Sequence, residues 1–379
     1  MRVGTVELHD FRSYVSATLT FEQGVNVLIG PNGIGKTNVV EAVGYISTLG
    51  SHRVAADLPL VRAGAAQAVV RAQCVRGDRS TVSEIMINPG RANRVQVNGS
   101  PVRPRDFVGK LRCVVFAPED QGLVRGDPSD RRRWLDDVLV QRAPRYAGVR
   151  SDYERVVRQR TALLKSMAAT RGAAARSGAT STLDVWDAQL AATGADLLFG
   201  RLSVLNELSG LVEEAYERVA PSKAATVDYD ARSSTDSGQK LPRDREQLEE
   251  TLRHQIEIRR SDELMRGVTL VGPHRDDLAL TIAGLPAKSY ASHGECWSLA
   301  LSMRLGAFEL MRRLDDGAGD PVLILDDVFA ELDEARRSAL VEVASGSEQV
   351  LVTAAVAHDI PPGLNGARFT VRAGEVARD

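Results

Sequence analysis

The sequence predicts an α/β protein whose parallel sheet is interrupted by a helical segment. Three observations predict this architecture. An apolar run leads into GPNGIGKT at Gly30–Thr37, a second apolar run, PVLILDD, ends in two acids at Asp327, and a long stretch of helical periodicity lies between them. Because most of the chain separates two motifs that belong to one sheet, we expect a large insertion and not a compact nucleotide-binding core.

GPNGIGKT is a complete phosphate-binding loop between a predicted strand and a predicted helix. Its glycines allow successive N–H groups to converge on phosphate oxygens at a helix N-terminus. Lys36 is expected to reach the β and γ phosphates as part of the catalytic machinery, and Thr37 to ligate Mg²⁺. The pattern indicates ATP or GTP binding, with a structural turn as the alternative. The candidate nucleotide-binding residues are Gly30, Pro31, Asn32, Gly33, Ile34, Gly35, Lys36, Thr37 and Asn38.

The run PVLILDD is typical of a strand buried on both faces in a parallel sheet. The carboxyl end of such a strand lies where these sheets bind ligands. We therefore predict that Asp326 holds Mg²⁺ through water and that Asp327 is a catalytic residue that orients the attacking water.

A third motif, Ser292-His293-Gly294-Glu295, precedes a predicted helix. The hydroxyl and backbone N–H groups at such a helix start can bind phosphate. The order of phosphate loop, S-x-G-E segment, two-acid strand and Leu332-Asp333 turn resembles the ABC-type ATPases. The resemblance implies that Ser292, Gly294 and Glu295 complete the ATP site of a second subunit, so that ATP holds a homodimer together.

More specifically, the chain resembles the RecF family of the SMC-like branch. The resemblance spans nearly the whole chain and is found in LHDFRSY (8–14), the phosphate loop, LGSHR (49–53), FAPEDQGLVRGDPSDRRRWLD (116–136), VGPHRDD (271–277), SHGE (292–295) and LDDVFAELD (325–333). Gln121, Ala291, His293 and Glu295 depart from the pattern expected of the family.

The resemblance implies an ATP-dependent DNA-binding protein of recombinational repair and replication. ATP-driven dimerisation would clamp double-stranded DNA near single-strand gaps and at single-strand/double-strand junctions. With the partners RecO and RecR, the dimer would support RecA loading, and weak, DNA-stimulated ATP hydrolysis would release the clamp. A transporter ATPase subunit and a small-molecule phosphotransferase remain the alternatives.

The resemblance also suggests accessory residues. Glu119 or Asp120 would sense the metal and γ-phosphate, Arg12 would lie near the phosphates, and His52 and Arg53 would contact nucleotide or DNA. His274 and Arg275 would serve either catalysis or a structural bridge between arm and head. Asp333 would belong to the subunit interface, and Thr353 is a weak substitute for the usual switch histidine.

The pattern along the chain predicts an ATPase head, with a mixed sheet, interrupted by a helical arm. The expected parts are residues 1–120 and 266–379 for the head and 121–265 for the arm. Five strands and one helix are expected before Phe116, with a hairpin at Asn98-Gly99. In the arm we expect loops at Ala168–Thr182 and Arg232–Lys240, and a last helix over Arg243–Met265.

Composition limits the class of protein. The net charge is −2, but residues 121–160 hold ten Arg and six acids, and Arg131–Arg133 lie among them. Other basic clusters are Arg103, Arg105, Lys110 and Arg112, and the pair Arg259 and Arg260. These arginines would either contact DNA phosphates or form solvated helix faces. The three cysteines lack metal-ligand spacing. No apolar run approaches the ~20 residues of a membrane span, and the start carries no signal sequence. We therefore expect a cytoplasmic protein without a membrane partner.

Overall fold

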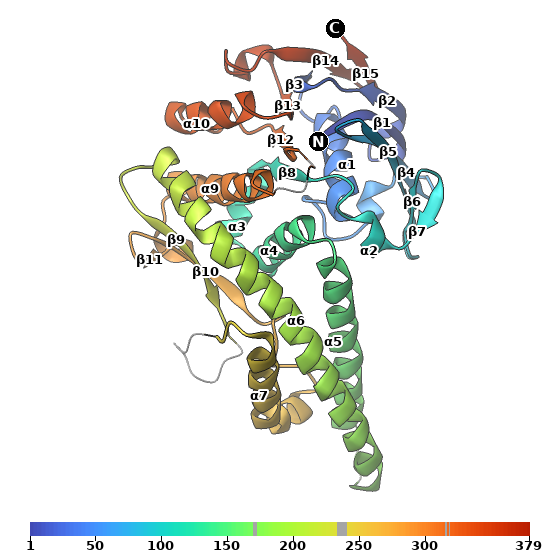
Figure 1. Ribbon diagram of the computed structural model, residues 1–379. Coiled ribbons are helices and arrows are strands. Elements are labelled where there is room, and N and C mark those ends of the chain that lie inside the picture. The colour runs from blue at the N-terminus through green and yellow to red at the C-terminus, as the bar shows by residue number, and fades with distance from the viewer. Residues whose placement is uncertain (170–172, 233–240, 315–316, 318) are drawn as a thin grey trace.

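The computed structural model describes residues 1–169, 173–232, 241–314, 317 and 319–379. Two six-stranded sheets lie at one end of the molecule, and long helices extend away from them (Figure 1). Among the described residues, no helix combines the length and apolar character needed to cross a membrane.

The sheet that carries the nucleotide motifs is mixed, as predicted. Its strand order is β15-β14-β3-β13-β12-β8, and all neighbouring strands are parallel except β14 and β15. The strands are β3 (Gly24–Ile29), β8 (Cys113–Phe116), β12 (Val322–Asp326), β13 (Gln349–Ala354), β14 (Gly366–Arg372) and β15 (Glu375–Arg378). All residues of β12 and β13 are buried, because other elements cover both faces of the sheet. The carboxyl ends of β3 and β12 therefore meet at one edge of the sheet.

The second sheet is antiparallel, in the order β2-β1-β4-β5-β6-β7. It consists of β1 (Arg2–Phe11), β2 (Tyr14–Thr20), β4 (Ala68–Arg76), β5 (Arg79–Ile87), β6 (Arg94–Val97) and β7 (Ser100–Val102). The predicted hairpin is confirmed, since Val97 pairs with Ser100 and both Asn98 and Gly99 have positive φ. Strand β2 was not predicted. Helix α1 (Lys36–Thr48) shares one hydrophobic core with this sheet.

The helical region contains α4 (Pro128–Arg142), α5 (Tyr146–Ala169), α6 (Ala173–Val219) and α7 (Arg245–Arg266). Helices α5 and α6 run side by side away from the sheets (Figure 1). The loop predicted over Ala168–Thr182 is wrong for most of its length, because α6 already begins at Ala173. Alanine is the strongest helix former and here outweighs the neighbouring Gly, Ser and Thr. Helix α7 confirms the predicted last helix, whereas the connection predicted at Arg232–Lys240 lies almost entirely outside the described residues.

A small antiparallel sheet lies beside these helices and was not predicted. It joins β9 (Ala225–Asp230), β10 (Asp277–Ile282) and β11 (Leu285–Pro286). The remaining helices are α2 (Pro104–Phe107), α3 (Gln121–Arg125), α8 (Ala287–Tyr290), α9 (His293–Arg312) and α10 (Glu334–Ser345). Helix α9 packs closely along α6, where a Cβ on Gly306 would lie only 2.8 Å from Val212. This packing places α9 and α6 in one hydrophobic core with the mixed sheet.

Three of the arginines considered for DNA contact make structural contacts. Arg131 is only 3% exposed and makes a bidentate ion pair with Asp277, with N···O distances of 2.7 and 2.9 Å. Arg132 donates to the backbone carbonyl of Asp276 at 2.6 Å. Both alternatives considered for this run, DNA contact and a solvated face, are therefore wrong for Arg131, because that face of α4 packs against the segment that leads into β10. Arg112 is likewise buried, and it donates to the carbonyl of Gln141.

Candidate nucleotide-binding site

The phosphate loop connects β3 to α1 with the expected backbone geometry. Gly33 and Gly35 have φ values of +78° and +117°, which a residue with a Cβ rarely adopts. The Lys36 side chain curls back over the loop, donating to the carbonyls of Gly30 at 2.7 Å and Pro31 at 3.1 Å. It lies 3.5 Å from Asn32 Oδ1. The loop is thus closed around its lysine, at the N-terminus of α1.

The second motif meets the loop at the same edge. Thr37 Oγ1 donates to Asp326 Oδ1 at 3.0 Å, and Thr353 Oγ1 donates to the same oxygen at 2.6 Å. Thr353 Oγ1 also accepts the backbone N–H of Asp327 at 2.9 Å. Asp327 has φ +54°, a left-handed conformation that turns its carboxylate away from the strand direction. Thr353, considered at most a weak substitute for a histidine, therefore connects β13 to both acids.

Burial changes the pKa values of charged groups at this edge. Burial raises the pKa of the Asp326 carboxyl. Burial also lowers the pKa of the Lys36 ammonium, although the negative charges of Asp327 and Asp326 act to raise it. Thr37 and Asp326 together offer the hydroxyl and carboxylate oxygens that Mg²⁺ prefers. Among the described residues no group of three or more His, Cys, Asp or Glu side chains could hold a metal, so a cation here needs further oxygens from phosphate and water.

A buried carboxylate that was not singled out in the sequence organises the rim of the loop. Glu41, on α1, is fully buried and accepts from Arg12 Nε at 2.8 Å and Nη2 at 2.6 Å. Ser51 also donates to it at 2.5 Å, and Arg53 lies 3.5 Å from it. Arg12 was expected beside the phosphates, but it is held by Glu41 and by the Pro59 carbonyl. The sequence gives little sign of this partner because an acid on a helix usually faces solvent.

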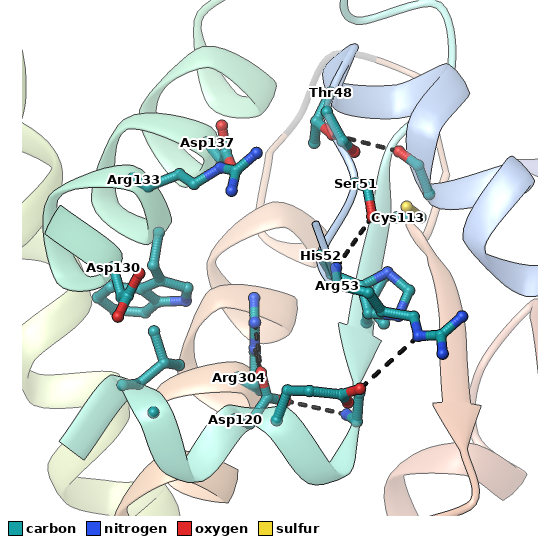
Figure 2. A pocket seen from close by; sticks show the side chains of 18 of the residues that line it. Thr48, Ser51, His52, Arg53, Cys113, Asp120, Asp130, Arg133, Asp137 and Arg304 are labelled. Carbon is teal, nitrogen blue, oxygen red and sulfur yellow. Dashed lines mark hydrogen bonds and ion pairs between the residues drawn. The ribbon is translucent and has the colours of Figure 1, made fainter. Parts of the chain in front are cut away.

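A cavity of about 290 Å³ adjoins the site between α1, β8 and α4 (Figure 2). His52 lines it, and its Nε2 lies 4.0 Å from Asp326 Oδ2 without a hydrogen-bond partner among the described residues. Burial lowers the pKa of this imidazole, although the surrounding acids act to raise it. Arg53 Nε lies 3.7 Å from Glu119 Oε1, so this loop faces the Glu119 carboxylate. Asp120 instead forms an ion pair with Arg304 at 2.5 Å and caps the turn at Ala117.

The S-x-G-E segment is built as a helix start. The Ser292 hydroxyl accepts from the Glu295 N–H, and the Glu295 carboxylate accepts from the Ser292 N–H at 2.8 Å. The pKa of Glu295 is lowered to about 2, mainly by its ion pair with Lys223 at 2.5 Å and next by the hydrogen bond from the Ser292 N–H. Within the described part of the chain, no hydrogen bond or ion pair joins Ser292–Glu295 to Gly30–Asn38. Within one chain, the segment and the phosphate loop are therefore not directly bonded.

The remaining candidates have structural contacts. Asp333 caps α10 by accepting from the Arg336 N–H at 3.0 Å. Arg275 donates to the Thr269 carbonyl at 2.5 and 3.0 Å. His274 Nδ1 lies 2.6 Å from the Tyr153 hydroxyl, which joins α5 to the VGPHRDD segment. These contacts support the structural alternative for His274 and Arg275.

The His274 contact predicts a pH-dependent stability. Burial is the main cause that lowers the pKa of His274 from 6.5 to about 4. Between those two pH values the unfolded chain binds a proton at this histidine that the folded chain does not. The free energy of unfolding therefore falls as the pH drops from about 6.5 to about 4, and this loss is absent above pH 6.5. The contribution is on the order of 3 kcal/mol. In urea titrations between pH 4 and 7, His274→Gln should show a flatter pH dependence than the unsubstituted protein, and an unchanged dependence would contradict this assignment.

Comparisons with known proteins agree with this geometry. A family model described as RecF/RecN/SMC N terminal domain matches residues 2–360. Among curated proteins, the DNA replication and repair protein RecF of Frankia alni is 54% identical and that of Nocardioides sp. is 52% identical, each covering all of both chains. A solved structure described as the recombination mediator protein RecF-ATP in the RecFOR pathway superposes with a TM-score of 0.85 at 25% identity, covering 99% of this chain and 97% of that one.

A more distant likeness fits the same picture. The Smc head domain of Pyrococcus furiosus, with an extended coiled coil, covers the whole chain with a TM-score of 0.53 at 15% identity, which shows the fold alone. The expected ATPase-head architecture is therefore confirmed. From the full-length matches and the arrangement of its motifs, we conclude that the chain belongs to the RecF family of DNA replication and repair proteins.

Proposed function

We propose that this protein binds ATP with Mg²⁺ and that two ATP-bound copies close around double-stranded DNA near single-strand gaps and junctions. Together with RecO and RecR it would support RecA loading, and slow hydrolysis would open the dimer. The solved relative described as RecF-ATP in the RecFOR pathway supports this partnership. The alternatives, a transporter subunit and a small-molecule phosphotransferase, have no support among the relatives reported above.

The observation that carries the proposal is the separation of the two phosphate-binding segments. Lys36, Thr37 and Asp326 would form one half of an ATP site, whereas Ser292 begins a helix that, in the described part of its own chain, has no hydrogen bond or ion pair to that half. A second copy can supply its Ser292 helix start to the first copy's phosphates, and the reverse contact follows by symmetry. ATP then stabilises the dimer because it binds both chains at once.

In the proposed site, each residue has one task. Lys36 places its positive charge at the β and γ phosphates, and the loop N–H groups bind their oxygens. Thr37 and Asp326 would hold Mg²⁺, which neutralises charge that develops on the phosphates during hydrolysis. Asp327 would orient the attacking water. Ser292 and Gly294 would donate to the γ-phosphate from the partner chain, whereas Glu295 would maintain the helix start through its capping bond.

The proposal also divides the chain by role. Residues 1–120 and 266–379 would form the ATP-binding head and residues 121–265 the arm that flanks DNA. Because the γ-phosphate is the bridge between the two chains, we expect turnover to be weak until DNA favours the closed dimer.

Ser292→Arg tests the proposal. The larger, charged side chain should block ATP-dependent dimerisation while ATP binding by the monomer stays within about two-fold of the unsubstituted protein, because Ser292 acts only on the partner's nucleotide. Light scattering with ATP and Mg²⁺ measures mass, and a labelled gapped duplex measures DNA affinity in the same samples. Ser166→Arg, on the exposed face of α5, is the matched control.

Two outcomes would contradict the proposal. If Ser292→Arg lost monomer ATP binding, Ser292 would belong to its own chain's site. If the unsubstituted protein bound ATP without change in mass or in DNA affinity, the nucleotide-gated clamp itself would be wrong.

A further inference from the structure

A second, strongly basic groove lies away from the nucleotide site. It encloses about 940 Å³ between the β4–β5 hairpin, α2 and the connection from α4 to α5. Its lining includes six cationic side chains, against the two carboxylates of Asp106 and Asp152. The six are Arg76, Arg79, Arg103, Arg105, Lys110 and Arg145. In a chain of net charge −2, this is a local concentration of positive charge.

Part of this charge is placed at a cost to stability. Arg76 and Arg79 are the last opposed residues of the β4–β5 hairpin. Like charges directly opposite each other on neighbouring strands destabilise a sheet. Arg76 Nε donates to the Gly317 carbonyl at 3.2 Å. An anion bound at this end of the hairpin would be attracted by both positive charges.

Three of the cations have no counterion in the described structure. The side chains of Arg79, Lys110 and Arg145 make no hydrogen bond or ion pair with any described residue. Arg145 lies over the ring of Tyr146, with its guanidinium carbon 5.2 Å from the ring centre, a contact that leaves its N–H donors available. Arg103 and Arg105 share the single carboxylate of Asp106, at 2.7 and 4.0 Å.

The groove is held in shape by a close approach of two segments. Gly109 follows α2 with φ +89°, and a Cβ there would lie 2.6 Å from Pro144 Cγ. The turn after α2 therefore packs directly on the α4–α5 connection. One wall consequently comes from the antiparallel sheet and α2, and the other from the start of α5.

We propose that this groove binds the phosphodiester backbone of double-stranded DNA. Arginine and lysine side chains that lack protein counterions bind phosphate oxygens independently of base sequence. The six cations come from three segments, so they form a track and not a single-phosphate pocket. Phosphates held here would contact the sheet and the start of the long helices together. The inference rests on the proposed function, because it names where that function meets its DNA.

The triple variant Arg79→Ala, Lys110→Ala, Arg145→Ala tests the groove. Gapped-duplex affinity is measured with ATP and Mg²⁺ at several salt concentrations. Losing three phosphate contacts should reduce the slope of log affinity against log salt by about 2 to 3 and weaken binding at least 10-fold at low salt. ATP-dependent dimerisation should be unchanged, since none of the three residues belongs to the nucleotide site.

A matched control removes the same charge elsewhere. Arg313, Arg368 and Arg378 are exposed, and their triple alanine variant should retain most of the DNA affinity and the salt slope. Equal losses in both variants, or no loss in the groove variant, would overturn the inference. Failure of the unsubstituted protein to bind DNA with ATP would instead refute the proposed function, so the two failures are distinguishable.

Discussion

Lys36→Ala is expected to lose ATP-dependent dimerisation and to weaken ATP binding by at least 100-fold. Lys36 is 5% exposed and its ammonium group already donates to two loop carbonyls, which fixes its position at the centre of the loop. Alanine removes the only lysine charge in the loop and, with it, the charge-assisted hydrogen bonds that the ammonium would donate to the β and γ phosphates. Such bonds contribute about 1.5–3 kcal/mol each.

Titration calorimetry with ATP and Mg²⁺ measures the affinity, and light scattering measures the mass. Lys165→Ala, on the exposed surface of α5, is the control and should behave as the unsubstituted protein. A Lys36→Ala protein that still formed the ATP-dependent dimer would show that Lys36 does not anchor the phosphates.

Arg201→Met is expected to cost 3–5 kcal/mol of unfolding free energy. Arg201, on α6, is 3% exposed and donates to both oxygens of Asp136 on α4, at 2.7 and 2.8 Å. Its Nη1 donates to the Pro273 carbonyl at 2.6 Å. Methionine fills much of the same volume but leaves the Asp136 carboxylate buried without its cation.

Urea titrations measure the loss, and a second substitution separates charge from packing. Arg201→Met with Asp136→Leu removes both charges, so this double variant should recover most of the stability lost in the single variant. Arg313→Met, at an exposed position, should change stability by less than about 0.5 kcal/mol. A double variant no more stable than Arg201→Met would show that packing and not the unpaired carboxylate sets the cost.

The meeting of the phosphate loop with the two-acid strand was predictable because its signals are local. The phosphate loop needs glycines at fixed positions, and a strand buried on both faces has to be apolar until its ligand-binding end, so Lys36, Thr37 and Asp326 were found together. Burial of Glu41 was not predictable, since its partner Arg12 lies in the turn after β1, far earlier in the chain. The β9–β10 pairing was missed for the same reason, because helix α7 separates the two strands.

Charge patterns in the sequence were a weaker guide than motifs. Arg131 and Lys110 both belong to basic clusters, yet Arg131 is buried against Asp277 and Lys110 faces the open groove. The difference depends on which face of an element packs, and this is set by tertiary contacts. The Ser292 segment illustrates another limit, since its proposed ligand is bound to a second copy of the chain.

The length of α6 gives the molecule a mechanical property. This single helix of 47 residues spans on the order of 70 Å, and its C-terminal half packs along α9. Just beyond its end, Lys223 is paired with Glu295 at the start of α9. A helix attached in this way acts as a lever, because a rotation of about 5° at the α9 end displaces the far end by roughly 6 Å. Small rotations of α9 at the proposed γ-phosphate contact would therefore displace the far end of α6 by a distance similar to the spacing of neighbouring phosphates along a DNA strand.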